Sequence, residues 1–221
     1  WRNFWLERAR RDQEVYKWDG VFLDNVEASV SKPSEYGFSA MESLTDASYQ
    51  ASIEANLRFI YINYFKPQNR PLYANIIALK DPSVWFRYMQ YLDGAMIEDF
   101  AVGWNNEYKD PAEWLTQIKI AEKTQALGKK VILVSQGTEF DTKRQVFSLA
   151  SYLLINNGKA YFRYTNSSSH DQNWLYENYK LNLGIPLGQR YKVGEFWMRN
   201  FTNGKVTVSP TLKTATIEMS K

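Results

Sequence analysis

The stretch DGVFLDNVEAS, residues 19–29, decides how the rest of the chain is interpreted. Its uninterrupted apolar run (21–23) ends at Asp24 and Asn25. A strand with one face in water alternates polar and apolar residues, whereas a strand of a parallel sheet is buried on both faces. The pattern therefore predicts a buried strand over 20–26 that meets water and a ligand only at its far end.

The same cycle of apolar run and helical pattern continues along the chain. Helices are predicted over 2–17, 45–65, 82–91, 111–127 and 141–156. Asp-Pro pairs open two of them, because proline suits the first helical turn and aspartate caps it. Between the helices lie apolar runs at 71–77, 94–100, 129–136 and 159–165. Alternation of this kind predicts a parallel sheet covered by helices.

The last part of the chain has a different pattern. Asn203-Gly204 lies between two apolar strands and predicts a hairpin with a type I′ turn. Residues 31–44, rich in Ser with Pro and Gly, are typical of a loop. We find no linker, and expect one domain over 1–191 with an antiparallel appendage over 192–221.

Composition excludes several classes of function. The 221 residues include 44% hydrophobic and 23% charged residues, with a net charge of +3 and no Lys/Arg block, which argues against a nucleic-acid partner. No apolar run approaches the length of a membrane span. With no cysteine and one histidine, His170, the chain has no disulfide or Cys-bound zinc, and zinc sites of the His-rich type are nearly excluded. We expect no cofactor and no metal, and a carboxylate-bound metal hydrolase is the weaker alternative. If the protein is an enzyme, carboxylates must carry out the catalysis.

Polar residues stand at the end of each predicted strand, where parallel sheets bind ligands. These residues are Asp24 and Asn25, Asn75, Glu98 and Asp99, Ser135 and Gln136, and Arg163 and Tyr164. One polar strand end is unremarkable, but five together predict a polar cleft with Asp24 on its rim.

Two acids on separate strands suit the hydrolysis of a glycosidic bond. One carboxylic acid protonates the leaving oxygen, while a carboxylate attacks the anomeric carbon or activates water. Asp24 and Glu98 are the candidates. Side chains alternate along a regular strand, so Glu98 and Asp99 would not both point inward, and Asp99 is the second choice. Structural roles stay open: Asp24 as a loop cap, and Glu98-Asp99 in an ion pair with Arg87 or Lys109.

Four aromatic residues are candidates for stacking on a sugar ring, although such side chains more often belong to the core. They are Tyr64, Trp85, Trp104 and Tyr164. His170, in the loop after the fifth strand, either contacts the ligand or lies in solvent.

The segments WDGVFLDNV, GAMIEDF, KKVILVSQG and RNFTNGKVTVSPT together resemble glycoside-hydrolase-like TIM-barrel families. The chain is most similar to glycosyl-hydrolase-like family 15, and more distantly to the endo-α-1,4-polygalactosaminidase (spherulin-4-like) family. In the latter group, the Asp of a G-x-x-x-D-N motif on the fourth strand is the nucleophile and a Glu ending the sixth strand is the acid/base. The resemblance places these roles on Asp24 and Glu98.

By this resemblance the chain holds strands four to eight of a (β/α)8 TIM barrel, followed by the β-hairpin. A full barrel takes about 250 residues, so the resemblance implies the C-terminal part of a barrel, with a first strand (20–26) whose outer edge is unpaired. It also implies a polysaccharide or oligosaccharide substrate. From the polar strand ends and the aromatic candidates, we expect the substrate-binding residues to be Asn25, Asn75, Asp99, Trp104, Gln136, Arg163 and Tyr164. We expect a retaining enzyme that is extracellular or in the cell envelope. The alternative function is a non-catalytic carbohydrate-binding or scaffold barrel domain.

Overall fold

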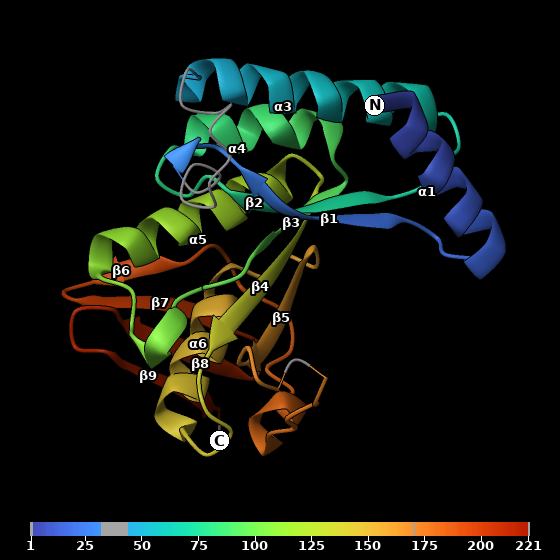
Figure 1. Ribbon diagram of the computed structural model, residues 1–221. Helices are drawn as coiled ribbons and strands as arrows, with labels where there is room; N and C mark the ends of the chain where they lie inside the picture. Colours follow the sequence, from blue (N-terminus) through green and yellow to red (C-terminus); the bar gives the residue numbers. More distant parts are fainter. Residues whose placement is uncertain (1, 32–43, 170, 221) are drawn as a thin grey trace. The chain divides into compact units, whose positions relative to one another are not determined.

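The computed structural model describes residues 2–31, 44–169 and 171–220 (Figure 1). The chain divides into two compact units, Trp1–Met96 and Ile97–Lys221. The loop expected at 31–44 lies mostly outside the described residues, and His170 lies outside them as well.

Unit 1 (Trp1–Met96) follows the predicted order of elements. Its elements are α1 (Arg2–Tyr16), β1 (Val21–Glu27), α3 (Asp46–Ile60), the π-helical turn η2 (Tyr61–Phe65), β2 (Leu72–Ile77), α4 (Pro82–Tyr88), the 3-10 turn η3 (Met89–Tyr91) and most of β3 (Gly94–Ile97). Thr45 caps α3 through a capping box with Ser48, and Asp81 caps α4 by accepting a hydrogen bond from Ser83 N. These caps satisfy N–H groups that have no partner inside the helix.

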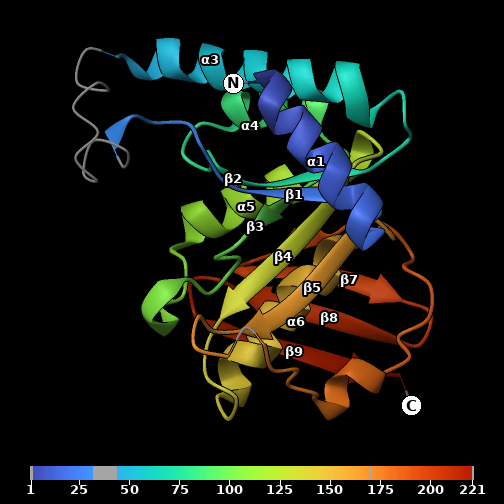
Figure 2. The ribbon, with the colours of Figure 1, turned by 45° about the vertical axis from the view of Figure 1, so that its right-hand side comes forward.

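The core of unit 1 lies between the strands and helices α3 and α4, which pack against each other (Figures 1 and 2). Fully buried side chains from both layers fill it: Leu57, Ile60, Phe65, Leu72, Ile76, Trp85 and Tyr88. Trp85 is also fully buried, and Tyr64 is only 5% exposed, so neither ring is available to stack on a sugar. Burial also raises the pKa of Tyr88 to about 12.

Five parallel strands follow one another in the order β1-β2-β3-β4-β5, as the alternation predicts. Among the described residues β1 pairs with β2 alone, so its other edge is open, as expected. Within the described chain, β5 does not pair with β1. The eight-stranded barrel and its strand count therefore stay a prediction.

Unit 2 (Ile97–Lys221) contains the remaining strand–helix elements and a second sheet. Its elements are η4 (Trp104–Asn106), α5 (Pro111–Ala126), β4 (Lys130–Gln136), α6 (Thr142–Ile155), β5 (Ala160–Thr165), η5 (Glu177–Lys180), β6 (Tyr191–Val193), β7 (Phe196–Phe201), β8 (Gly204–Ser209) and β9 (Thr214–Met219). Asp110 caps α5 through the N–H groups of Ala112 and Glu113, as the Asp-Pro pair predicts.

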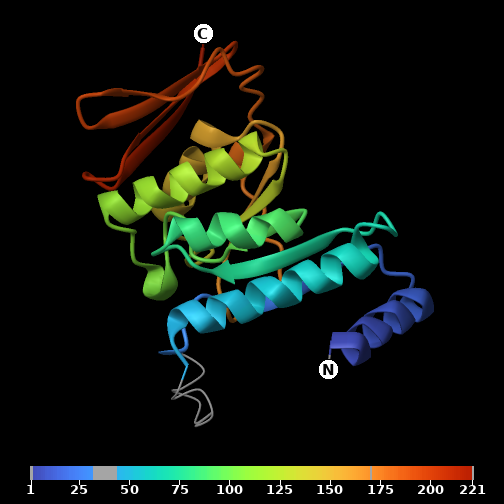
Figure 3. The same ribbon diagram turned by 90° about the horizontal axis from the view of Figure 1, so that it is seen from above.

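Helix α6 is the centre of unit 2. It packs on β4 and β5 and also on β8 and β9, so its apolar residues are buried on both sides (Figure 2). The antiparallel strands β6–β9 lie beside α5 and α6 (Figure 3), and Trp114 of α5 contacts Trp197 of β7. The predicted appendage is thus a four-stranded sheet packed on helices. Its separation as a domain at residue 192 stays a prediction.

The hairpin at residues 203–204 forms, but the predicted type I′ turn is wrong. Phe201 pairs with Gly204, so Thr202 and Asn203 form the turn, and neither has the positive φ that type I′ requires. Gly204 is needed for space instead: a Cβ there would lie 2.3 Å from the Glu218 carbonyl oxygen.

Within the described residues, no helix is long and apolar enough to cross a membrane.

Candidate active site

Asp24 lies on β1 in unit 1, where the strand departs from regular pairing. Leu23 pairs with Ala74 and Val26 pairs with Ile76, so β1 carries one residue more than β2 between these points. The extra residue makes a β-bulge, a feature that often re-aims a side chain beside a functional site. Asn75 Nδ2 donates a hydrogen bond to Asp24 Oδ1 over 3.1 Å. Asp24, Asn25 and Asn75 are therefore neighbours on adjacent strands, but they lie within β1 and β2 and not at the strand ends that the sequence predicts.

Glu98 and Asp99 lie just beyond β3, which ends at Ile97. The expectation that they alternate along a regular strand is therefore wrong, because both residues belong to a turn. Gln136 Nε2 donates a hydrogen bond to the Glu98 backbone oxygen over 2.7 Å. This contact brings together two of the predicted site residues in unit 2, at the ends of β3 and β4.

The carboxylate of Asp99 is fully engaged by its neighbours. Lys109 Nζ pairs with Oδ2, and Gln117 Nε2 donates to Oδ1 over 3.1 Å. Asp99 therefore forms the ion pair with Lys109 that was the structural alternative to an acid/base role. Gln117 also accepts a hydrogen bond from the Ala101 N–H over 2.9 Å. No sequence pattern indicated Gln117, because a buried glutamine within a helix has no periodic signature.

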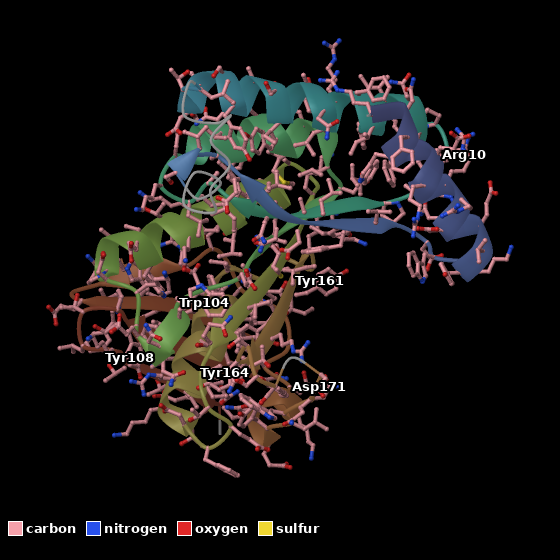
Figure 4. The ribbon with its side chains drawn as sticks, in the orientation of Figure 1. Arg10, Trp104, Tyr108, Tyr161, Tyr164 and Asp171 are labelled. Atoms are coloured by element: carbon pink, nitrogen blue, oxygen red, sulfur yellow. The ribbon has the colours of Figure 1, made fainter. Side chains whose placement is uncertain are left out.

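Trp104 stands on a short hairpin that the Asp99–Lys109 pair closes. Val102 and Tyr108 form an antiparallel bridge, and two left-handed asparagines at 105 and 106 turn the chain at the tip, with φ of 61° and 60°. Arg144 lies over the Tyr108 ring at 5.0 Å from its centroid. The hairpin therefore holds Trp104 (Figure 4) on a well-braced backbone. The Trp104 side chain is 46% exposed.

Tyr164 on β5 is buried, with 2% of its surface exposed, which leaves little of its ring for a ligand. Trp174 and Tyr176 pack around it, and its hydroxyl donates to the Asp141 carbonyl oxygen over 3.4 Å. Burial, followed by the nearby Asp141, raises the pKa of Tyr164 well above its ordinary value.

Gln136 and Arg163 occupy the other predicted positions in unit 2. The Gln136 side chain is 4% exposed, and its Oε1 is buried without a hydrogen-bond partner within the described structure. Arg163 donates to the Gln172 carbonyl oxygen over 2.9 Å. Within the described residues, no three acidic, histidine or cysteine side chains form a group that could hold a metal ion.

A family model described as "Hypothetical glycosyl hydrolase family 15" matches residues 1–205 of this chain. The chain belongs to this family. In this member of hypothetical glycosyl hydrolase family 15, the match runs through both units and into the first strands of the antiparallel sheet.

Comparison of this family 15 chain with solved structures finds the glycoside hydrolase domain of PelA from Pseudomonas aeruginosa, and a variant of that domain. The sequence identities are 15% and 16%, with a TM-score of 0.48 for each. In both cases the match covers 76% of this chain and 60% of the other. No curated protein matches the chain significantly.

Proposed function

We propose that this chain belongs to a glycoside hydrolase that cleaves O-glycosidic bonds of a polysaccharide by a retaining mechanism. Family membership supports the reaction class. The observation that carries the residue assignment is the exposed carboxylate of Asp24, held by Asn75 at the bulge of β1. A carboxylate fixed by hydrogen bonds on one side and open to solvent on the other suits a nucleophile.

In the proposed reaction, a lone pair of Asp24 forms a bond to the anomeric carbon while the glycosidic carbon–oxygen bond breaks. The electrons of that bond go to the leaving oxygen, which takes a proton from Glu98. Water then attacks the anomeric carbon, gives a proton to the Glu98 carboxylate and releases Asp24. No cofactor takes part in this scheme.

The wild-type protein should release new reducing ends from one of a panel of neutral and amino-sugar exopolysaccharides. Reducing-sugar assays would detect cleavage, and proton NMR at early times would show which anomer forms first. Saturable binding to a polysaccharide without any cleavage would instead favour the non-catalytic carbohydrate-binding barrel. Because such substrates lie outside the cytoplasm, we propose an extracellular or cell-envelope location.

Trp104 is proposed as a platform for a sugar ring, since it is exposed on a braced hairpin close in sequence to Glu98. Trp104→Ala should raise KM about 3- to 10-fold with little change in kcat, because stacking on an aromatic face contributes uniform binding energy. Trp104→Phe should retain part of the effect.

Trp18→Ala is the matched control, because Trp18 is 53% exposed and precedes the amino end of β1, outside the proposed substrate-binding residues. Steady-state kinetics on the best polysaccharide would measure both variants. Equal KM values for the Trp104→Ala variant and the wild type would remove Trp104 from the substrate site.

A further inference from the structure

The backbone at Asp24 and Asn25 departs from a regular strand. Asn25 lies in the left-handed region, with φ of 51°, within the stretch where β1 carries its extra residue. Asparagine tolerates this conformation better than most residues other than glycine, whereas a β-branched side chain strains it. The left-handed turn directs the Asn25 N–H to Asp24 Oδ1, over 2.9 Å.

A second donor reaches the same oxygen from the neighbouring strand. Asn75 is 1% exposed, and its Nδ2 donates to Asp24 Oδ1 over 3.1 Å. Oδ1 thus accepts two hydrogen bonds. Within the described residues no hydrogen bond or ion pair reaches Oδ2, and the Asp24 side chain is exposed. The two oxygens of one carboxylate therefore have different environments.

We propose that the bulge and Asn75 form a positioning device that fixes Asp24 Oδ1 and presents Oδ2 as the reacting atom. This inference rests on the proposed role of Asp24 as nucleophile. It changes the expected roles of two residues: Asn75 acts through Asp24 instead of binding substrate, and Asn25 acts through its backbone conformation and its N–H.

The assignment is chemically consistent through the reaction. When Oδ2 bonds to the anomeric carbon, the glycosidic electrons go to the leaving oxygen together with the Glu98 proton. Oδ1 then becomes the carbonyl oxygen of the glycosyl ester and still accepts both N–H groups. The same two hydrogen bonds therefore orient the carboxylate before attack and the ester before hydrolysis.

Asn75→Ala and the volume-matched Asn75→Leu remove the side-chain donor. Both should lower kcat about 10- to 100-fold, because a small misplacement of a reacting group has effects of this size. KM should change by less than about threefold, since no substrate contact is lost. Crystal structures of these variants should show Asp24 in more than one orientation, whereas the wild type should show one.

Asn25 offers a second and independent pair of variants. Asn25→Gly keeps the left-handed backbone and the position of the N–H. Asn25→Val disfavours the left-handed backbone and so displaces the N–H. The glycine variant should retain far more of kcat than the valine variant. Asn69→Val is the matched control, because Asn69 is another left-handed asparagine of unit 1, with φ of 50°, in the loop before β2. It should be destabilised without a change in kcat.

The outcomes separate this inference from the proposed function. A rise in KM at constant kcat for Asn75→Ala would show that Asn75 binds substrate and would overturn the inference. Equal losses for Asn25→Gly and Asn25→Val would show that the Asn25 side chain acts directly, with the same consequence. If Asp24 becomes disordered in the Asn75 variants but kcat is unchanged, the positioning holds and the nucleophile assignment fails.

Discussion

Asp24→Asn and Glu98→Gln are each expected to lower turnover by orders of magnitude while the protein stays folded. General acid–base catalysis alone contributes about 10²- to 10⁴-fold, and the loss of a nucleophile removes the covalent route altogether. Both substitutions are nearly isosteric, so circular dichroism and urea unfolding should match the wild type. Initial rates on the polysaccharide identified by the screen would measure the effect.

Two acids outside the predicted site serve as matched controls. Asp19 lies just before β1, at the amino end of that strand, and Glu113 lies in the first turn of α5. Asp19→Asn and Glu113→Gln should leave turnover unchanged. Full activity in Asp24→Asn or Glu98→Gln would reject the role of that residue.

Azide distinguishes the two catalytic roles. In a retaining enzyme, azide can replace a missing nucleophile in Asp24→Ala and give a glycosyl azide of inverted configuration. It can also attack the glycosyl-enzyme of Glu98→Ala, which then gives the retained configuration. An experimental structure of the whole protein should show carboxyl groups about 5–5.5 Å apart, whereas about 6.5–9.5 Å would indicate an inverting pair.

Arg199→Ala is expected to produce the largest loss of stability, about 3–5 kcal/mol in the free energy of unfolding. Arg199 on β7 is 2% exposed. Its guanidinium donates to the carbonyl oxygens of Leu153 and Asn156 at the end of α6, over 3.1 and 2.8 Å, and to the Gly188 oxygen over 3.0 Å. It also donates to Asn157 Oδ1 over 2.7 Å. Truncation would leave these acceptors without partners.

The charge of Arg199 also favours this position, because the carbonyl end of a helix attracts cations. Burial nevertheless lowers the pKa of Arg199, so the hydrogen bonds must offset a desolvation cost. Arg199→Lys keeps the charge but loses the planar fork of donors, and should recover only a minor part of the stability.

Lys205→Met, on the neighbouring strand β8, is the control cation. Lys205 pairs with Glu218 at 3.3 Å with both side chains well exposed, so its loss should change stability by about 0.5 kcal/mol or less. Urea unfolding followed by tryptophan fluorescence would compare the three variants. An Arg199→Ala protein as stable as the Lys205→Met protein would show that these hydrogen bonds contribute little to stability.

The sequence alone determined the order and type of the elements, because these depend on local chemistry. Apolar runs, Asp-Pro caps and the Asn-Gly pair are short-range signals, and they predicted the five parallel strands, the helices between them and the C-terminal hairpin. The prediction that a buried strand ends at Asp24 is wrong, because β1 continues to Glu27 and Phe22, in the apolar run before Asp24, is 44% exposed.

Only the tertiary structure decided how the polar groups are used, because hydrogen bonds between distant segments leave no periodic trace. The short β3 places Asp99 in a turn, where Lys109 and Gln117 engage both oxygens of its carboxylate. Close contact with Glu218 explains Gly204 better than turn type does. The β1 bulge, visible only in its register with β2, brings Asn75 to one oxygen of Asp24 and leaves the other exposed. Contacts between distant segments, and not local propensity, determine these interactions.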